Sequence, residues 1–280
     1  MSEPLVLKAR IAAPVDRVRA ALTDPVELRG WLAEHVEAGA DRFEFWGVSI
    51  PEGDAPHQRL VSWEPLTFTW DLAGETTTVS FELAAVGEET SLTLTQSHFV
   101  GWPAAATTEE GALALVGTFW GLALANLVEH IEGRALTPRV DLTGSDLSAT
   151  IDIAASADRV YQALTDQDEF AAWFGYQVGI EPHVGGRWAM GGFENNPSPA
   201  RVAVAEPGRA FSLDFGPGYG VASWELAESD GRTRLTFVQS GFGDNPPYNG
   251  WLGWLSGFAE LRRYLEQSDW RSTWVDLVIA

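Results

Sequence analysis

Two glutamines lie where strand alternation turns them toward an apolar face. Gln96 and Gln239 lie in the strand-like runs 91–98 and 233–241, each on a face that also carries hydrophobic residues. Those hydrophobic residues are Leu92 and Leu94 in the first run and Leu235 and Phe237 in the second. A buried amide left without a partner costs roughly 1–3 kcal/mol. Each glutamine therefore bonds to the backbone or to a buried water, or it anchors a ligand, and both readings stay open.

One histidine shares this expected inward face. His98 follows Gln96 by two residues, so alternation places it on the same side, and it is the candidate for general acid–base catalysis. Gly241 occupies the matching position after Gln239. The other histidines, His35, His57, His130 and His183, show no metal-ligand spacing. We therefore expect no metal site and no cofactor.

Thirteen tryptophans accompany these polar groups. Their rings either fill a core or line a pocket that holds a flat apolar ligand, and both readings stay open. Met190 begins a sharp turn that would form the rim of such a pocket. The candidate ligand-binding residues are Trp46, Trp63, Trp70, Phe81, Gln96, His98 and Trp120, followed by Trp188, Met190, Trp224, Gln239, Trp251 and Trp254.

The elements that position these residues occur twice. Ile11–Leu32 and Ile153–Phe174 are identical at 12 of 22 positions without a gap. Because the two copies start 142 residues apart, the repeat is a whole domain and not a solenoid unit. We expect a first domain at 1–137, a linker at 138–146, and a second domain with an extra C-terminal tail at 147–280.

Each copy has the same pattern of periodicities. It predicts a strand, two short helices, a run of six strands and one long helix, which makes the chain α+β. The expected long helices span 109–134 and 249–267, and each has one apolar face. The tail at 273–280 has strand propensity and could pair with a sheet edge of the other half.

Composition excludes several functions. The net charge of -21 argues against nucleic acid and anionic membranes as partners. The absence of cysteine excludes disulfides and thiolate chemistry. No signal peptide is visible and no apolar run approaches 18 residues, so we expect a cytoplasmic protein without a transmembrane helix.

Three groups of residues carry a family resemblance. They are the opening motif at 11–32, the Glu-Pro pairs at 64–65 and 206–207, and the closing pattern that begins at Trp120 and at Trp254. The chain resembles the activator of heat-shock-protein-90 ATPase homologues, which lie within the START/Bet v 1-like group, also called SRPBCC. The resemblance implies two helix-grip domains, each an antiparallel sheet wrapped around its long C-terminal helix. The chain departs from the co-chaperone in its two copies, its strongly acidic composition and its lack of a separate N-terminal chaperone-binding domain.

The resemblance and the residues together predict a binding protein. We expect non-enzymatic binding of a small apolar or aromatic ligand between sheet and long helix, with the two domains packed on each other. A co-chaperone-like or stress-response interaction protein is one alternative, with no particular protein partner indicated. A cyclase- or hydrolase-type enzyme that uses the same cavity is the other.

Overall fold

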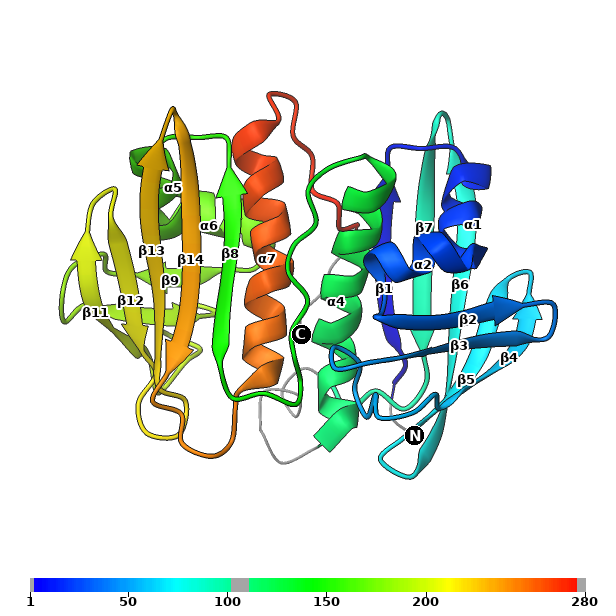
Figure 1. Ribbon diagram of the computed structural model, residues 1–280. Helices are drawn as coiled ribbons and strands as arrows, with labels where there is room; N and C mark the ends of the chain where they lie inside the picture. Colours follow the sequence, from blue (N-terminus) through cyan, green and yellow to red (C-terminus); the bar gives the residue numbers. More distant parts are fainter. Residues whose placement is uncertain (1–2, 102–110, 276–280) are drawn as a thin grey trace. The chain divides into compact units, whose positions relative to one another are not determined.

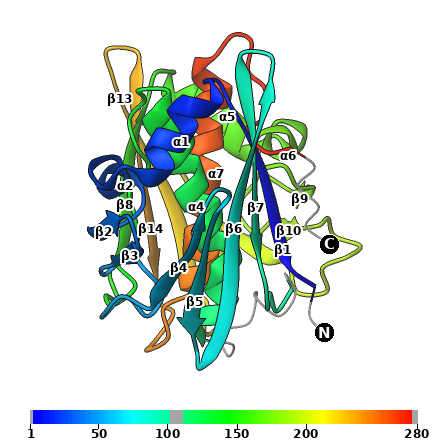
Figure 2. The same ribbon diagram turned by 90° about the vertical axis from the view of Figure 1, so that its right-hand side faces the viewer.

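The structure is a computed structural model that describes residues 3–101 and 111–275. It separates into two compact units. The first holds the described residues up to Thr143 together with residues 248–259 and 273–275, and the second holds residues 144–247 and 260–272. Figures 1 and 2 show that each repeat has an antiparallel sheet and a long helix. The chain is therefore α+β, as expected, whereas the domain limits at 137 and 147 stay a prediction.

The first repeat contains the expected succession of elements. They are β1 (Leu5–Ile11), α1 (Val15–Thr23), α2 (Pro25–Trp31), β2 (His35–Gly39), β3 (Arg42–Trp46), β4 (Gln58–Trp63), β5 (Leu66–Leu72), β6 (Glu75–Val86), β7 (Glu89–Gln96) and α4 (Gly111–Ile131). One sheet has the order β1-β7-β6-β5-β4, and β2 and β3 form a hairpin of their own. The Gln58 carboxamide accepts the backbone N–H of Phe45 at 3.0 Å and so links β3 to β4. The expected first turn of the long helix, Glu109 and Glu110, lies outside the described residues.

The second repeat follows the same order in one continuous sheet. Its elements are β8 (Leu147–Ile153), α5 (Ala157–Thr165), α6 (Gln167–Phe174), β9 (Val178–Ile180), β10 (Arg187–Met190), β11 (Ala200–Glu206), β12 (Ala210–Asp214), β13 (Val221–Ser229), β14 (Arg232–Ser240) and α7 (Tyr248–Glu266). The seven strands lie in the order β8-β14-β13-β12-β11-β10-β9. Alternate residues of β8 and β14 are buried, so one face of this sheet is its core face.

The repeated Thr-Asp pair separates the two short helices of each copy. The carboxylate of Asp24 accepts the first backbone N–H groups of α2, and Asp166 does the same for α6. Aspartate is a favoured N-cap because it satisfies N–H groups that have no partner within the helix. One helix therefore ends and the next begins at the same residue in both copies.

The repeated tryptophan of the opening motif serves the core. Trp31 donates its indole N–H to the carbonyl of Ala21 at 3.0 Å, and Trp173 donates to Ala163 at 2.8 Å. Both rings are almost fully buried. Each tryptophan thus fastens the second short helix to the first, and the opening motif maintains the fold.

The C-terminal tail pairs with an edge strand of the first unit. The backbone N–H of Arg10 donates to Thr273 at 2.7 Å, and that of Val275 donates to Lys8 at 2.9 Å. Because β1 is the edge of its sheet, the described part of the tail, 273–275, pairs with a sheet edge as expected, through an isolated bridge between Ala9 and Trp274. Residues 276–280 lie outside the described part of the chain.

Helix α4 is unusually apolar. By length and composition it is the one helix among the described residues that could cross a membrane. However, 72% of its most apolar window is buried within the structure, as in the core helix of a globular protein. Its apolarity is therefore explained by protein packing.

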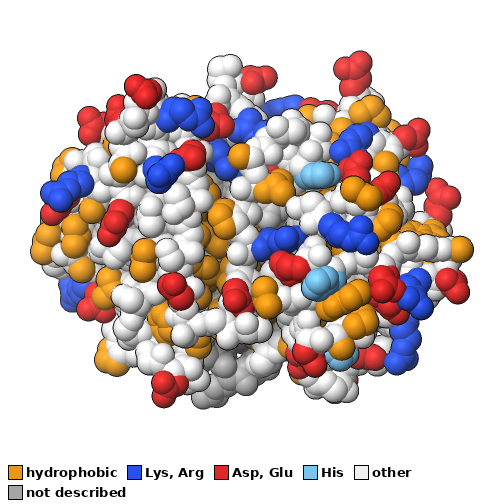
Figure 3. Space-filling view, in the orientation of Figure 1, with side chains coloured by type: hydrophobic (Ala, Val, Ile, Leu, Met, Phe, Trp, Pro, Cys, Tyr) orange, Lys and Arg blue, Asp and Glu red, His pale blue; other side chains and the backbone are white. Residues whose placement is uncertain are grey.

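Charged side chains are interspersed on the surface in view. Figure 3 shows carboxylates and guanidinium groups scattered among each other on this face, with no single basic patch. Many are ion-paired, for example Arg17 with Glu27 and Arg159 with Glu169. The acidic excess is thus distributed over this face.

Candidate functional site

Both polar atoms of the Gln96 side chain have partners in its own domain. Its side chain is 0% exposed, and its Nε2 donates to Thr77 Oγ1 at 3.1 Å. Its Oε1 accepts the indole N–H of Trp120 at 2.6 Å. Thr77 in turn donates to the carbonyl of Trp70 at 2.9 Å. In the first repeat the glutamine therefore joins β7, β6 and α4.

Aromatic rings fill the space around Trp120. Ring centroids at 4.9–6.4 Å from the Trp120 centroid belong to Phe45, Trp70, Phe81 and Phe119. The indole N–H of Trp70 finds no acceptor among the described residues, but Trp70 is 0% exposed within this cluster. These rings pack in the tilted and edge-on arrangements typical of cores. Trp70, Phe81 and Trp120 are therefore core residues of the first repeat.

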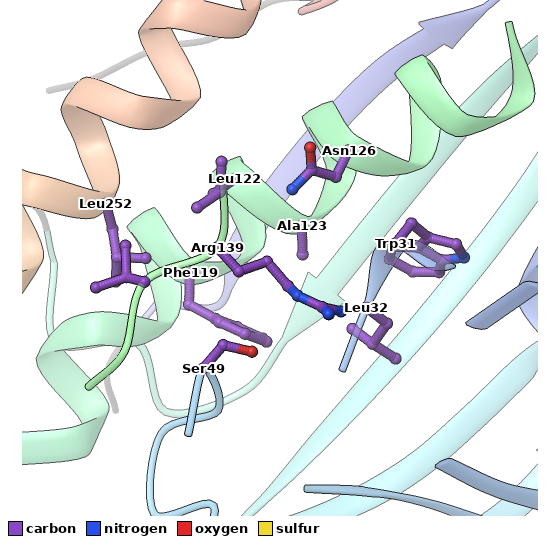
Figure 4. Close-up of a pocket in the computed structure, with 10 residues that line it drawn as sticks. Trp31, Leu32, Ser49, Phe119, Leu122, Ala123, Asn126, Arg139 and Leu252 are labelled. Atoms are coloured by element: carbon purple, nitrogen blue, oxygen red, sulfur yellow. The ribbon is translucent and has the colours of Figure 1, made fainter. Parts of the chain in front are cut away.

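A small cavity lies beside α4 in the first unit. Figure 4 shows its lining, to which α4 contributes Phe119 and Asn126. Its volume is about 10 Å³, which is at most enough for one water. On its rim, Ser49 Oγ donates to the Glu34 carboxylate at 2.9 Å, so this polar pair is already satisfied. This cavity is too small for an organic ligand.

Gln239 differs from Gln96 in the hydrogen bonding of its side-chain oxygen. Its Nε2 donates to the carbonyl of Tyr219 at 2.9 Å, which fixes the orientation of the amide. Its Oε1 is buried, and no described residue donates to it. The residue as a whole is 6% exposed. The second repeat thus contains a buried acceptor whose counterpart in the first repeat receives an indole N–H.

Strand register shows that the side chains around Gln239 are also smaller than those around Gln96. Gln96 pairs with Val79 and Leu5, and Gln239 pairs with Ala222 and Leu147. Counting outward from these pairs, Leu213 stands in place of Phe68, Phe215 in place of Trp70, Gly220 in place of Thr77, and Ala222 in place of Val79. All four changes reduce volume at the glutamine end of the sheet face.

At the opposite end of that sheet face, the side chains are larger in the second repeat than in the first. There Phe211 stands in place of Leu66, Trp224 in place of Phe81, and Phe237 in place of Leu94. The Trp224 ring lies 4.9 Å from Phe237 and 5.9 Å from Phe211, so this end is a packed aromatic cluster. At the paired positions of β12, β13 and β14 the larger side chains therefore lie at the end away from Gln239, while Trp188 of β10 packs on Phe215 at 5.9 Å.

The end of the sheet that carries Gln239 is rich in glycine. Antiparallel pairing brings the connections 191–199, 215–220 and 241–247 to this end. Gly220 has a φ of 72°, and a Cβ there would meet the carbonyl oxygen of Ser240 at 2.0 Å. No side chain fits at Gly220, so the threonine hydroxyl of the first repeat has no counterpart.

His98 does not face the core. Strand β7 ends at Gln96, and His98 is exposed with a φ of 60°. Its ring lies 3.0 Å from the Ser97 hydroxyl. The expected inward orientation is wrong because alternation stops where the strand ends. Gly241 has the same left-handed backbone, with a φ of 76°, so the difference between the copies reflects a turn conformation.

The remaining candidate residues are spread over several places. Trp46 stacks on His35 at 5.3 Å, and the Trp63 indole donates to the Gly39 carbonyl at 3.1 Å, so both belong to the surroundings of the β2–β3 hairpin. In the second repeat, Trp188 is buried and lies 5.9 Å from Phe215, and Met190 is half-buried at the end of β10. Trp251 and Trp254 are buried on the half of α7 that groups with the first unit.

A polar cluster that sequence reasoning missed ties the short helices to the long one. Glu27 accepts from Arg17 at 2.7 Å and lies 3.0 Å from His130 Nε2. Burial raises the pKa of the Glu27 carboxyl, but the hydrogen bonds from Arg17 and His130 outweigh it and the net pKa is lowered. In the second copy Glu169 accepts from Arg159 and from Tyr264. The recurrence of Arg and Glu ten residues apart was the available signal.

The Gln239 carboxamide can form hydrogen bonds but cannot transfer protons. A carboxamide neither gains nor loses a proton near neutral pH, so it orients a ligand and does not act as general acid or base. Among the residues that the structure describes, no three His, Asp or Glu side chains gather as a metal site would require. The arrangement therefore fits a recognition site.

Comparisons with known proteins agree with the fold. The family model of activator of Hsp90 ATPase homolog 1-like protein matches residues 12–132 and again residues 154–266. The chain therefore belongs to this family and contains its domain twice, which confirms the resemblance and the duplication. No curated protein matches the chain.

Similar solved structures have low identity. The Mesorhizobium loti protein MLL2253 is 21% identical, with 44% of this chain and 99% of that chain covered and a TM-score of 0.36. The Aha1 dimer from Colwellia psychrerythraea is 19% identical, covers 44% and 98%, and has a TM-score of 0.37. DynU16, a protein in the dynemicin biosynthetic locus, is 18% identical, covers 95% and 98%, and has a TM-score of 0.38.

Proposed function

We propose that the second repeat binds a small apolar or aromatic ligand, without catalysis, on the core face of its sheet at the end that carries Gln239. The observation that carries this proposal is the buried Gln239 Oε1, which no described residue satisfies. A buried acceptor without a donor costs about 1–3 kcal/mol. A ligand that reaches this atom would recover that free energy.

The loss of volume around Gln239 supports the same proposal. Phe68, Trp70, Thr77 and Val79 of the first repeat have smaller counterparts in the second. Binding sites for small molecules are concave and mainly apolar, with a few polar groups that set orientation. In this proposal the first repeat has a structural role, because its Gln96 is hydrogen-bonded and its aromatic rings are packed.

Refilling the space tests the proposal. In the double variant Leu213→Phe/Ala222→Val, the side chains of the first repeat are restored, and we expect ligand binding to weaken at least tenfold while the chain stays folded. A diverse panel of flat hydrophobic molecules, followed by isothermal titration calorimetry and ligand-observed NMR, provides the probes. Ala203→Val is the matched control, since Ala203 is exposed on β11. The proposal fails if no molecule of the panel binds, or if the refilled variant binds as well as the wild type.

No specific observation favours the co-chaperone-like alternative. Such a role calls for a contiguous exposed apolar patch. The large hydrophobic residues that are most exposed, Val26, Val61 and Val184, come from α2, β4 and the turn before β10. The binding function is therefore the one that the described residues support best.

A further inference from the structure

We propose that the ligand of the second repeat is a neutral aromatic molecule that carries one N–H or O–H donor, and that Gln239 Oε1 accepts this donor. An indole or a phenol represents the class. The inference rests on the proposed function and specifies its ligand chemistry.

The free atom must be an acceptor. Nε2 of Gln239 donates to a backbone carbonyl, that of Tyr219, and only the amide nitrogen can do so. The two ends of the carboxamide therefore cannot exchange places. Oε1 is left as the buried end, and only a donor satisfies it. Ketones, ethers and esters without a donor would place oxygen against oxygen.

The first repeat shows which group this glutamine accepts. Gln96 holds the same register position in β7 as Gln239 in β14, and its Oε1 accepts the indole N–H of Trp120 at 2.6 Å. The bonded indole lies among rings, with Phe81 at 5.5 Å and Trp70 at 5.9 Å. In the first repeat, the glutamine at this register position therefore already binds an aromatic N–H donor.

The walls near Gln239 favour a neutral molecule. Its neighbours on the strands beside it are Ala222 and Leu147, and Leu213 and Phe215 follow on β12 and just beyond it. A carboxylate would lose its hydration in these apolar surroundings, and a carboxamide oxygen repels it. An uncharged ring with one donor matches both the wall and the acceptor.

A matched pair of probes tests the donor directly. Indole and 1-methylindole differ in the N–H, and 1-naphthol and 1-methoxynaphthalene differ in the O–H. Titration calorimetry on the full chain should show that the donor member of each pair binds about tenfold more tightly, as expected for one hydrogen bond to a buried acceptor. Affinity that is equal within each pair would overturn the inference and leave the proposed function intact. If no member of the two pairs binds and no molecule of the wider apolar panel binds, the inference and the proposed function are both wrong.

A variant assigns the preference to Gln239. In Gln239→Leu the ratio within each pair should fall to about one, because the acceptor is gone while the apolar volume remains. Ser240→Ala is the matched control, since Ser240 is exposed and adjacent alternation turns it to the other face. A preference that persists in Gln239→Leu would overturn the assignment. If Gln239→Leu does not fold, the wild-type ratios decide by themselves.

Discussion

Trp120 donates its indole N–H to the carboxamide oxygen of Gln96 at 2.6 Å inside the first repeat. Both residues are 0% exposed. The bond connects the long helix to the sheet across the centre of the core. The matching oxygen of Gln239 receives no donor from any described residue. The glutamine oxygen at this register position is therefore hydrogen-bonded in one copy and has no described donor in the other.

Removal of the indole N–H should destabilise the first repeat. Trp120→Phe keeps a ring in the core but leaves Gln96 Oε1 without a donor, and we expect a loss of about 1–3 kcal/mol in the free energy of unfolding. Urea denaturation measures it. In the double variant Trp120→Phe/Gln96→Leu the unpaired oxygen is also removed, so the double loss should be smaller than the sum of the single losses. If the two losses are additive, the side chains of Trp120 and Gln96 are not energetically coupled.

Acid should weaken the Glu27 cluster. The folded pKa of Glu27 is lowered, so its stabilising contribution is present above the ordinary value of 4.5 and is lost as the pH falls below it. Glu27→Gln should therefore reduce the acid-induced loss of stability, with an effect of about 0.5–1 kcal/mol at neutral pH. Urea unfolding between pH 3 and pH 7 tests this. Glu82→Gln, on an exposed side chain of β6, is the control for removal of a surface carboxylate.

The tail should protect one set of backbone groups in β1. Because Arg10 N–H donates to Thr273, truncation after Ser272 should accelerate hydrogen exchange at Arg10 by at least tenfold. Ala9, opposite Leu92 in the antiparallel pair, should keep its protection because alternate residues of β1 bond to β7. Equal acceleration at both amides would show that β1 as a whole has become unstable.

His98 should be replaceable by glycine. Since its φ of 60° is costly for a residue with a Cβ, His98→Gly should be neutral or stabilise the chain by up to about 1 kcal/mol. Thermal unfolding measures the change, and ligand affinity should not move. Loss of binding in this variant would restore a functional role for the imidazole.

Most of the fold could be predicted because its causes are local. The two Thr-Asp pairs mark helix boundaries through capping, and alternation in β7 and β14 correctly turns Gln96 and Gln239 inward. The prediction for His98 was wrong at the point where a strand ends, and a strand end depends on the turn that follows. Trp46 is half-buried against His35 because adjacent residues of β3 face opposite sides.

The duplication, the order of elements and the inward orientation of the two glutamines can be predicted from the residues alone. These follow from periodicity and capping, which act over a few residues. The contacts of each glutamine depend instead on how distant parts of the chain pack together. Thr77 and Trp120 lie 19 and 24 residues from Gln96 in the chain, and strand register and helix packing bring them to it. The same strand register places Gly220 and Ala222 beside Gln239. The two glutamines therefore have different neighbours, and strand pairing determines which ones.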